Sequence, residues 1–167
     1  VQGATFTWTN GSGTDNYWTN AGNWDEDGVD TGNYPDNFGN VVINNTSNTG
    51  KAVLNDSDVG KFSYVLIGHG DQAGSDVGVL DITGSDAYMR PDIEFTVGKV
   101  GATGTVNQDG GEVLVSTNAF TIGNQGTGTY NLSGGKMNAG SILIGPGGGT
   151  GEFNVSGTGT FQARSTA

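Results

Sequence analysis

The sequence predicts an all-β protein that folds as a single-stranded parallel β-helix, or β-solenoid, with three short strands per coil and an aromatic N-terminal cap. Glycine accounts for 32 of the 167 residues, and short alternating apolar runs end at one or two glycines. This pattern is typical of short strands joined by tight turns. The runs also recur about every 22 to 30 residues, which indicates a solenoid.

Each repeat contains three apolar runs. The first is followed at once by glycine and occurs at residues 78–83, 104–109, 128–133 and 151–156. The second is shorter and occurs at residues 87–89, 112–115, 136–139 and 160–163. The third ends in glycine and occurs at residues 65–68, 95–98, 120–123 and 142–145. Three strands are too few for a propeller blade and fit one coil of a parallel β-helix. We expect it to be right-handed, as parallel crossovers almost always are.

Alternation along these strands predicts which side chains face the core. In the first strand the aligned inward positions are Leu80, Val106, Tyr130 and Phe153, followed by Ile82, Gln108, Leu132 and Val155. In the second we align Ala87 with Val113 and Met137, and Met89 with Val115 and Ala139. In the third they are Val65, Phe95, Phe120 and Ile142, followed by Ile67, Val97, Ile122 and Ile144. Only one of these columns contains a polar residue, so they predict a continuous apolar core.

The outward positions of the first strand are polar. They hold Asp81, Asn107, Asn131 and Asn154. Neighbouring strands in a sheet lie about 4.8 Å apart, so amides at these positions are within reach of one another. We therefore expect a ladder of side-chain hydrogen bonds that runs from coil to coil.

Residues 1–60 do not follow the repeat, and we expect them to form an irregular cap and a first coil. They contain all three tryptophans of the chain, Trp8, Trp18 and Trp24. A solenoid needs such a cover, because an open coil exposes its core and its unpaired strand edges. The tryptophans are therefore expected to close the N-terminal end of the core.

Residues 61–167 hold the repeats, and no comparable cap follows the last of them. The last coil contains Phe153, Val155 and Phe161. An uncapped coil offers apolar side chains and strand edges to a neighbour. We predict that these three residues take part in self-association.

The charge of the chain limits its partners. Its 17 acidic and six basic residues give a net charge of −11. Six dispersed cations cannot form the basic patch that nucleic acid or an anionic membrane surface requires. No apolar run is long enough to span a bilayer. The sequence starts at Val1, and we expect a removed secretion signal and an extracellular or cell-surface location.

An acidic segment near the N-terminus is the candidate metal site. Asp25, Asp27, Asp30 and Asp36 lie close together in the sequence. Calcium binds carboxylate and carbonyl oxygens on loops, although the spacing lacks the periodicity of an EF-hand. The alternative is a solvated acidic loop. We expect no other cofactor.

Two further candidates concern binding and catalysis. Trp8, Trp18 and Trp24 could stack on sugar rings, although burial in the cap is the simpler interpretation. His69 is the only histidine, and no nucleophile is placed beside it, so a Ser-His-Asp arrangement cannot be built. Several polysaccharide-degrading enzymes are parallel β-helices, but that is an analogy of fold alone. We predict no catalytic residues.

The chain resembles a family of secreted bacterial proteins. The resemblance rests on Phe6-Thr-Trp8, Trp18, Ala21-Gly-Asn-Trp24, Pro35, Val41-Val-Ile43 and the repeats at residues 128–135 and 141–145. These motifs are similar to the autotransporter-associated β-strand repeats, also found in surface proteins with a PEP-CTERM sorting signal. The resemblance implies export, a β-helix and a role at the cell surface or in extracellular matrix. It implies no catalytic residues.

Three functions fit these features. The first is a structural or adhesive protein that associates head to tail into a surface or matrix fibre. The second is a stalk fragment of a larger secreted adhesin, in which further coils cover the open end. The third is a carbohydrate-binding module that recognises extracellular polysaccharide.

Overall fold

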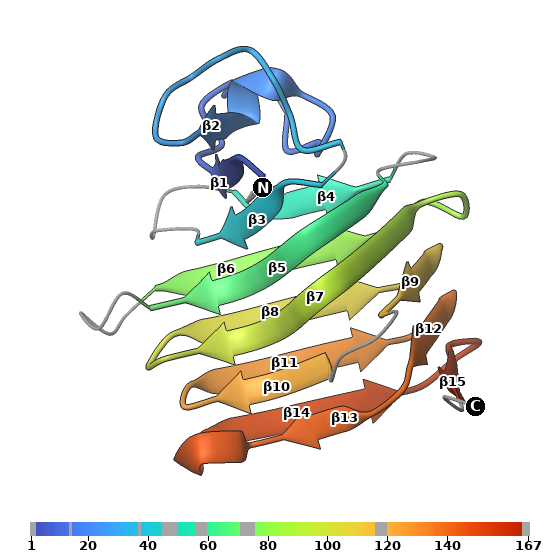
Figure 1. The fold of residues 1–167 in the computed structure, drawn as a ribbon. Helices are drawn as coiled ribbons and strands as arrows, with labels where there is room; N and C mark the ends of the chain where they lie inside the picture. The colour runs from blue at the N-terminus through green and yellow to red at the C-terminus, as the bar shows by residue number, and fades with distance from the viewer. Residues whose placement is uncertain are drawn as a thin grey trace.

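The computed structural model describes residues 3–13, 15–36, 38–44, 50–55, 60–70, 76–115 and 120–164. The chain is nearly all β, and parallel coils stack into a solenoid of about four turns (Figure 1). The predicted parallel β-solenoid is therefore confirmed. No helix in the described part of the chain has the length and hydropathy needed to span a bilayer.

One face of the solenoid is a regular parallel sheet. Its strands, in spatial order, are β4 (Ala52–Leu54), β6 (Val77–Ile82), β8 (Thr103–Gln108), β11 (Thr127–Leu132) and β14 (Thr150–Val155). The register is in step throughout, so the four first-strand glycines lie side by side. At Gly128 an added Cβ would collide with the backbone oxygen of Val97. Glycine at this position thus allows the close approach of two backbones that a tight coil corner requires.

The opposite face is built from a second set of strands that are also parallel to one another. They are β3 (Asn40–Ile43), β5 (Lys61–His69), β7 (Tyr88–Lys99), β10 (Phe120–Asn124) and β13 (Ile142–Ile144). Three shorter strands continue the coil beside them: β9 (Glu112–Leu114), β12 (Lys136–Ala139) and β15 (Thr160–Ala163). The later coils therefore have the three strands that the sequence predicts.

In the earlier coils, two of the expected strands join into one. β7 runs without a break over both predicted runs, residues 87–89 and 95–98. The segment between them remains extended because it pairs with the first half of β5, where Lys61 lies opposite Arg90 and Tyr64 opposite Glu94. The expectation of three short strands in every coil is wrong for this part of the chain.

One predicted alignment is also wrong. Val113 stacks on Met89 and not on Ala87. Six residues separate Ile82 from Met89, whereas four separate Gln108 from Val113. The earlier turn thus contains two more residues, which moves the next strand by two positions without changing the face that it buries. Ala87 remains buried.

The core follows the predicted columns. In the coils before the last one, the aligned apolar side chains of the first and third strands are completely buried, and the exception in the columns is Gln108. Its amide nitrogen donates to the backbone oxygens of Gly110 and Lys136, both at 3.0 Å, and to that of Gly111 at 3.3 Å. Its amide oxygen accepts from the Tyr130 hydroxyl at 2.6 Å. A buried polar group with every hydrogen bond formed is compatible with a stable core.

The cap consists of an antiparallel pair, β1 (Thr5–Trp8) and β2 (Trp24–Glu26), with β1 also parallel to β3. The 3-10 turn η1 (Ala21–Asn23) leads into β2. The three indole rings are at most 1% exposed, with centroids of adjacent rings 4.8 and 4.9 Å apart. Each indole N–H donates to a backbone oxygen, at Gly50, Pro35 and Trp18 respectively. The cap thus covers the N-terminal end of the core, as predicted.

The Gln108–Tyr130 pair generates a stability prediction. Burial raises the pKa of the Tyr130 phenol well above its ordinary value, so the hydroxyl remains a donor. Gln108→Leu leaves that hydroxyl without its amide acceptor and removes the amide donor from three backbone oxygens, of which that of Gly111 still accepts from the Lys136 N–H. The substitution should lower the free energy of unfolding by about 2 to 4 kcal/mol. Urea denaturation measures the loss.

The matched variants are Tyr130→Phe and the double variant. If the two side chains form one unit, the double variant should lose less stability than the sum of the two single variants. Strict additivity would contradict the account of a coupled buried pair.

Candidate functional site

The coil made of β13, β14 and β15, which we call the open coil, is uncovered on one side. Each of its strands pairs with only one other strand of the described chain. Ile144 and Val155 are 54% and 50% exposed, whereas their column neighbours Ile122 and Leu132 are 0% exposed. In every earlier coil, side chains at these two positions are buried against the next coil. In the open coil the same positions point inward by alternation, but no described strand covers them.

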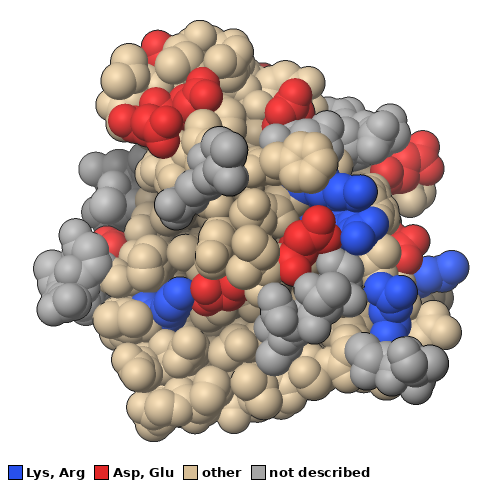
Figure 2. All heavy atoms as spheres, viewed as in Figure 1, with Lys and Arg blue, Asp and Glu red and all other residues tan. Residues whose placement is uncertain are grey.

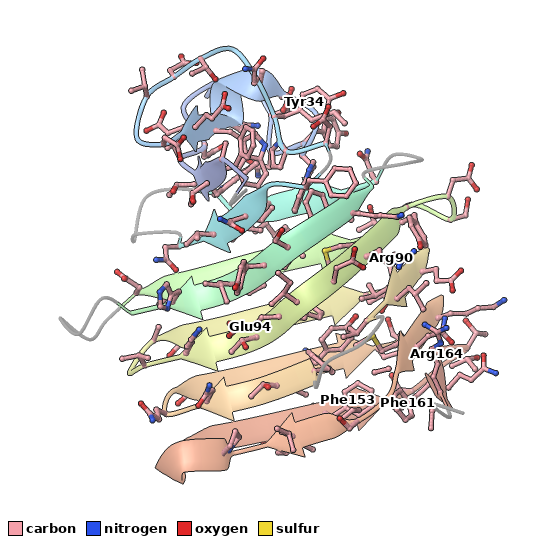
Figure 3. The ribbon with its side chains drawn as sticks, viewed as in Figure 1. Tyr34, Arg90, Glu94, Phe153, Phe161 and Arg164 are labelled. Carbon is pink, nitrogen blue, oxygen red and sulfur yellow. The ribbon has the colours of Figure 1, made fainter. Side chains whose placement is uncertain are left out.

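Two phenylalanines partly fill the open coil. Phe153 and Phe161 are partly buried and pack against the core, with their ring centroids 5.5 Å apart. Figure 3 labels both at the C-terminal end of the solenoid. The structure thus brings together Phe153, Val155 and Phe161, which the sequence singles out, and adds Ile144. The sequence shows Ile144 in the same third-strand column, so that column was the available signal.

The predicted polar ladder is present and has a direction. Asn107, Asn131 and Asn154 each donate their amide N–H to the oxygen of the preceding member, at 2.9, 2.9 and 3.0 Å. The first acceptor is the Asp81 carboxylate, which also pairs with Lys51. A carboxylate can only accept, so Asp81 fixes the orientation of every amide that follows.

The two ends of the ladder therefore differ. Lys51 and Asp81 close the N-terminal end with an ion pair. At the other end, the Asn154 side-chain oxygen accepts no hydrogen bond from any described residue. The open coil thus has an amide oxygen without a bond from the ladder, whereas the corresponding oxygen in each earlier coil accepts from the next asparagine.

The charge is distributed unevenly between the ends. Residues 1–112 contain 16 acidic and four basic residues, a net of −12, and residues 113–167 contain one acidic and two basic, a net of +1. On the face that Figure 2 displays, the lowest part, over β13, carries no red or blue atoms. The N-terminal part of the chain is acidic, and the open coil is nearly neutral.

The tryptophans that the sequence offers as glycan stackers are enclosed. Trp8, Trp18 and Trp24 are 0 to 1% exposed. No ring face is available to a sugar in this fold, and the stacking interpretation fails for these residues. Their burial in the cap is the interpretation that the exposed fractions support.

The predicted acidic segment does not converge on one point. Asp27 accepts from the backbone N–H of Thr5 at 2.9 Å, and Asp30 accepts from that of Gly32 at 3.0 Å. Asp25 lies on β2 opposite Thr7. Within the described ranges, no three His, Cys, Asp or Glu side chains form a group that could hold a metal ion. Calcium binding at these residues stays a prediction.

Asp36 lines a hollow of the cap. This hollow has a volume of about 350 Å³ and is lined by Phe6, Glu26, Gly32, Asn33, Tyr34 and Asp36. Hydrogen bonds from Asn33 and Thr31 hold the pKa of Glu26 below its ordinary value. These bonds use one carboxylate oxygen to fasten the loop, so Glu26 has a local structural role.

A second hollow lies on the outer face of the sheet that contains β3, β5 and β7. This groove has a volume of about 410 Å³ and is lined by Thr5, Asn40, Val42, Tyr64, Leu66, His69, Glu94 and Lys99. Sequence reasoning missed it, because its residues come from four strands far apart in the chain. It is not the paired-carboxylate site of a glycoside hydrolase, since Glu94 is the only carboxylate among these lining residues.

We compared the chain with known proteins in three ways. A scan of protein-family models, a search of curated proteins and a search of solved structures each found no match to this chain. The fold and these surfaces define the class, a capped parallel β-solenoid with one open coil.

The ladder predicts that an asparagine in the middle contributes more to stability than one at the end. Asn131 both donates and accepts within the ladder, whereas Asn154 only donates. Asn131→Ala should lower the free energy of unfolding by about 1 to 2 kcal/mol, and Asn154→Ala by less than half of that. Urea denaturation of the two variants provides the comparison. Equal losses would show that the ladder does not transmit stability between coils.

Proposed function

We propose that this chain is a structural β-solenoid that associates end to end with a second copy of itself through the open coil. The single observation that carries the proposal is the exposure of Ile144 and Val155, whose column neighbours are completely buried. Burial of apolar area of this kind is the main driving force for association. Pairing of the uncovered strand edges would also satisfy backbone groups that are otherwise prone to unspecific aggregation.

The cap limits the geometry of this association. A head-to-tail fibre needs a receiving face at the N-terminal end, but β2 at that end bonds to its own turn, with reciprocal hydrogen bonds between Glu26 and Val29. The indole rings beneath it are enclosed. These contacts favour the meeting of two open coils, which is an isologous arrangement with two-fold symmetry.

The charge distribution supports the same geometry. Joining two nearly neutral open coils places the two acidic N-terminal parts at opposite ends of the dimer. Like charges repel less at greater separation. A head-to-tail contact would place the acidic cap of one copy against the next copy and gain little, since the open coil has almost no net charge.

A stalk of stacked coils in a larger adhesin is the second candidate. The specific observation in its favour is the ladder, because a further parallel coil with an Asn at this position would donate to Asn154 as Asn154 donates to Asn131. Under both candidates the chain is structural or adhesive and not an enzyme. The secreted, cell-surface or matrix setting rests on the resemblance to autotransporter-associated repeats.

Substitution in the open coil tests self-association. Ile144→Asp combined with Val155→Asp places two unpaired charges in the proposed contact, which should weaken association at least about 100-fold. Leu143→Asp is the matched control, because Leu143 lies on the same strand, is 48% exposed, and points outward by alternation. It should leave association intact. Light scattering across a concentration series measures the mass.

A chain that stays monomeric at high concentration would contradict self-association and favour the stalk. Long filaments in electron microscopy, in place of dimers, would show that the cap does receive an open coil. Filaments that dissolve on addition of a calcium chelator would locate the predicted acidic site in that contact.

A further inference from the structure

We propose that the groove on the outer face of β3, β5 and β7 binds a neutral oligosaccharide. This inference is independent of end-to-end association, because the groove lies on the side of the solenoid and not at its end. Figure 3 shows Glu94 on β7, on the face of the sheet turned toward the viewer and away from the open coil. The volume of about 410 Å³ falls in the range of small-ligand sites.

The lining of the groove combines apolar and polar groups. Val42 and Leu66 are register partners and point outward from the sheet. The side chain of Tyr64 lies beside them in the groove. Aliphatic and aromatic surfaces of this kind suit the C–H face of a sugar ring. Charged and amide groups adjoin this surface, as recognition of hydroxyl groups requires.

The polar groups retain unused hydrogen-bonding capacity. One carboxylate oxygen of Glu94 accepts from both Thr96 and Lys99 at 2.7 Å, and no donor from the described chain reaches the other. The Lys99 ammonium has three N–H groups, and among the described residues its side chain donates to Glu94. A hydroxyl group both donates and accepts, so a sugar hydroxyl can bond to Glu94 and to Lys99 at once.

Asn40 supplies independent support. This residue is only 6% exposed, and its amide nitrogen donates to the Gly3 backbone and to Thr5, both at 3.3 Å. Its amide oxygen is buried and accepts no hydrogen bond from any described residue. A buried oxygen without a donor is costly. Because Asn40 lines the groove, a rotation of its amide toward the groove would let a ligand hydroxyl group donate to this oxygen.

The arrangement of these groups indicates the class of ligand. Asn40, Tyr64 and Glu94 occupy the same register position on three adjacent strands, so they extend over about 10 Å along the solenoid axis. This length suits an extended oligomer better than a single ion. Glu94 and Lys99 neutralise each other, and the net charge of −11 repels polyanions. A neutral oligosaccharide satisfies both conditions.

The test is calorimetric titration of the 167-residue chain with neutral hexasaccharides, namely those of cellulose, laminarin, mannan, xylan and chitin. At least one should bind at millimolar concentration or below. Glu94→Gln retains the acceptor for Thr96 but weakens the bond to a sugar hydroxyl, and it should lower the affinity about tenfold. Tyr64→Ala should abolish measurable binding.

Tyr88→Ala is the matched control, because Tyr88 lies on the same strand as Glu94 and outside the groove. It should bind as the unmodified chain does, and circular dichroism checks that every variant is folded. Failure of all five oligosaccharides to bind would overturn the proposal. So would loss of binding in Tyr34→Ala but not in Tyr64→Ala, which would locate the site in the cap, or binding of alginate alone.

Discussion

The structure depends on one constraint, which is that a coil is stabilised mainly by the coils stacked beside it. A single coil of three short strands has no hydrogen bonds of its own across the sheet and cannot enclose its apolar side chains. Stacking supplies both, since strand edges pair and columns such as Val97, Ile122 and Ile144 close against one another. Stability in such a protein is approximately a sum over nearest neighbours. At each end of the stack one neighbour is missing, so interactions other than those of the repeat have to cover the core and the strand edges.

The two ends of the solenoid differ in structure. At the N-terminal end, an antiparallel hairpin, three enclosed indole rings and the Lys51–Asp81 ion pair complete the sheet, the core and the ladder respectively. At the other end of the described residues, all three remain incomplete in the same coil. The sheet edge, the core column and the ladder are thus all left incomplete in one coil, which is the coil that we propose as the surface for association. The groove beside the cap is separate from the open coil.

Much of this could be predicted from the sequence, because the glycine spacing and the alternation of side chains encode local geometry. The inward columns, the ladder and the cap follow from these two periodicities. The alignment of Ala87 was predicted wrongly, because the sequence shows two extra residues after Ile82 but not whether they belong to the turn or to the next strand. The union of two strands in β7 depends on a distant partner, the first half of β5. The groove depends on long-range register even more, since it brings together Asn40, Tyr64 and Glu94.

We propose that a second copy covers the open coil, and amide hydrogen exchange at low and high protein concentration can detect this cover. Amides of β13, β14 and β15 should exchange rapidly in dilute protein and become protected as the concentration rises. Amides of β1, β2 and β8 should exchange at the same rate at both concentrations. Protection of the cap, or exchange in the open coil that does not depend on concentration, would contradict it.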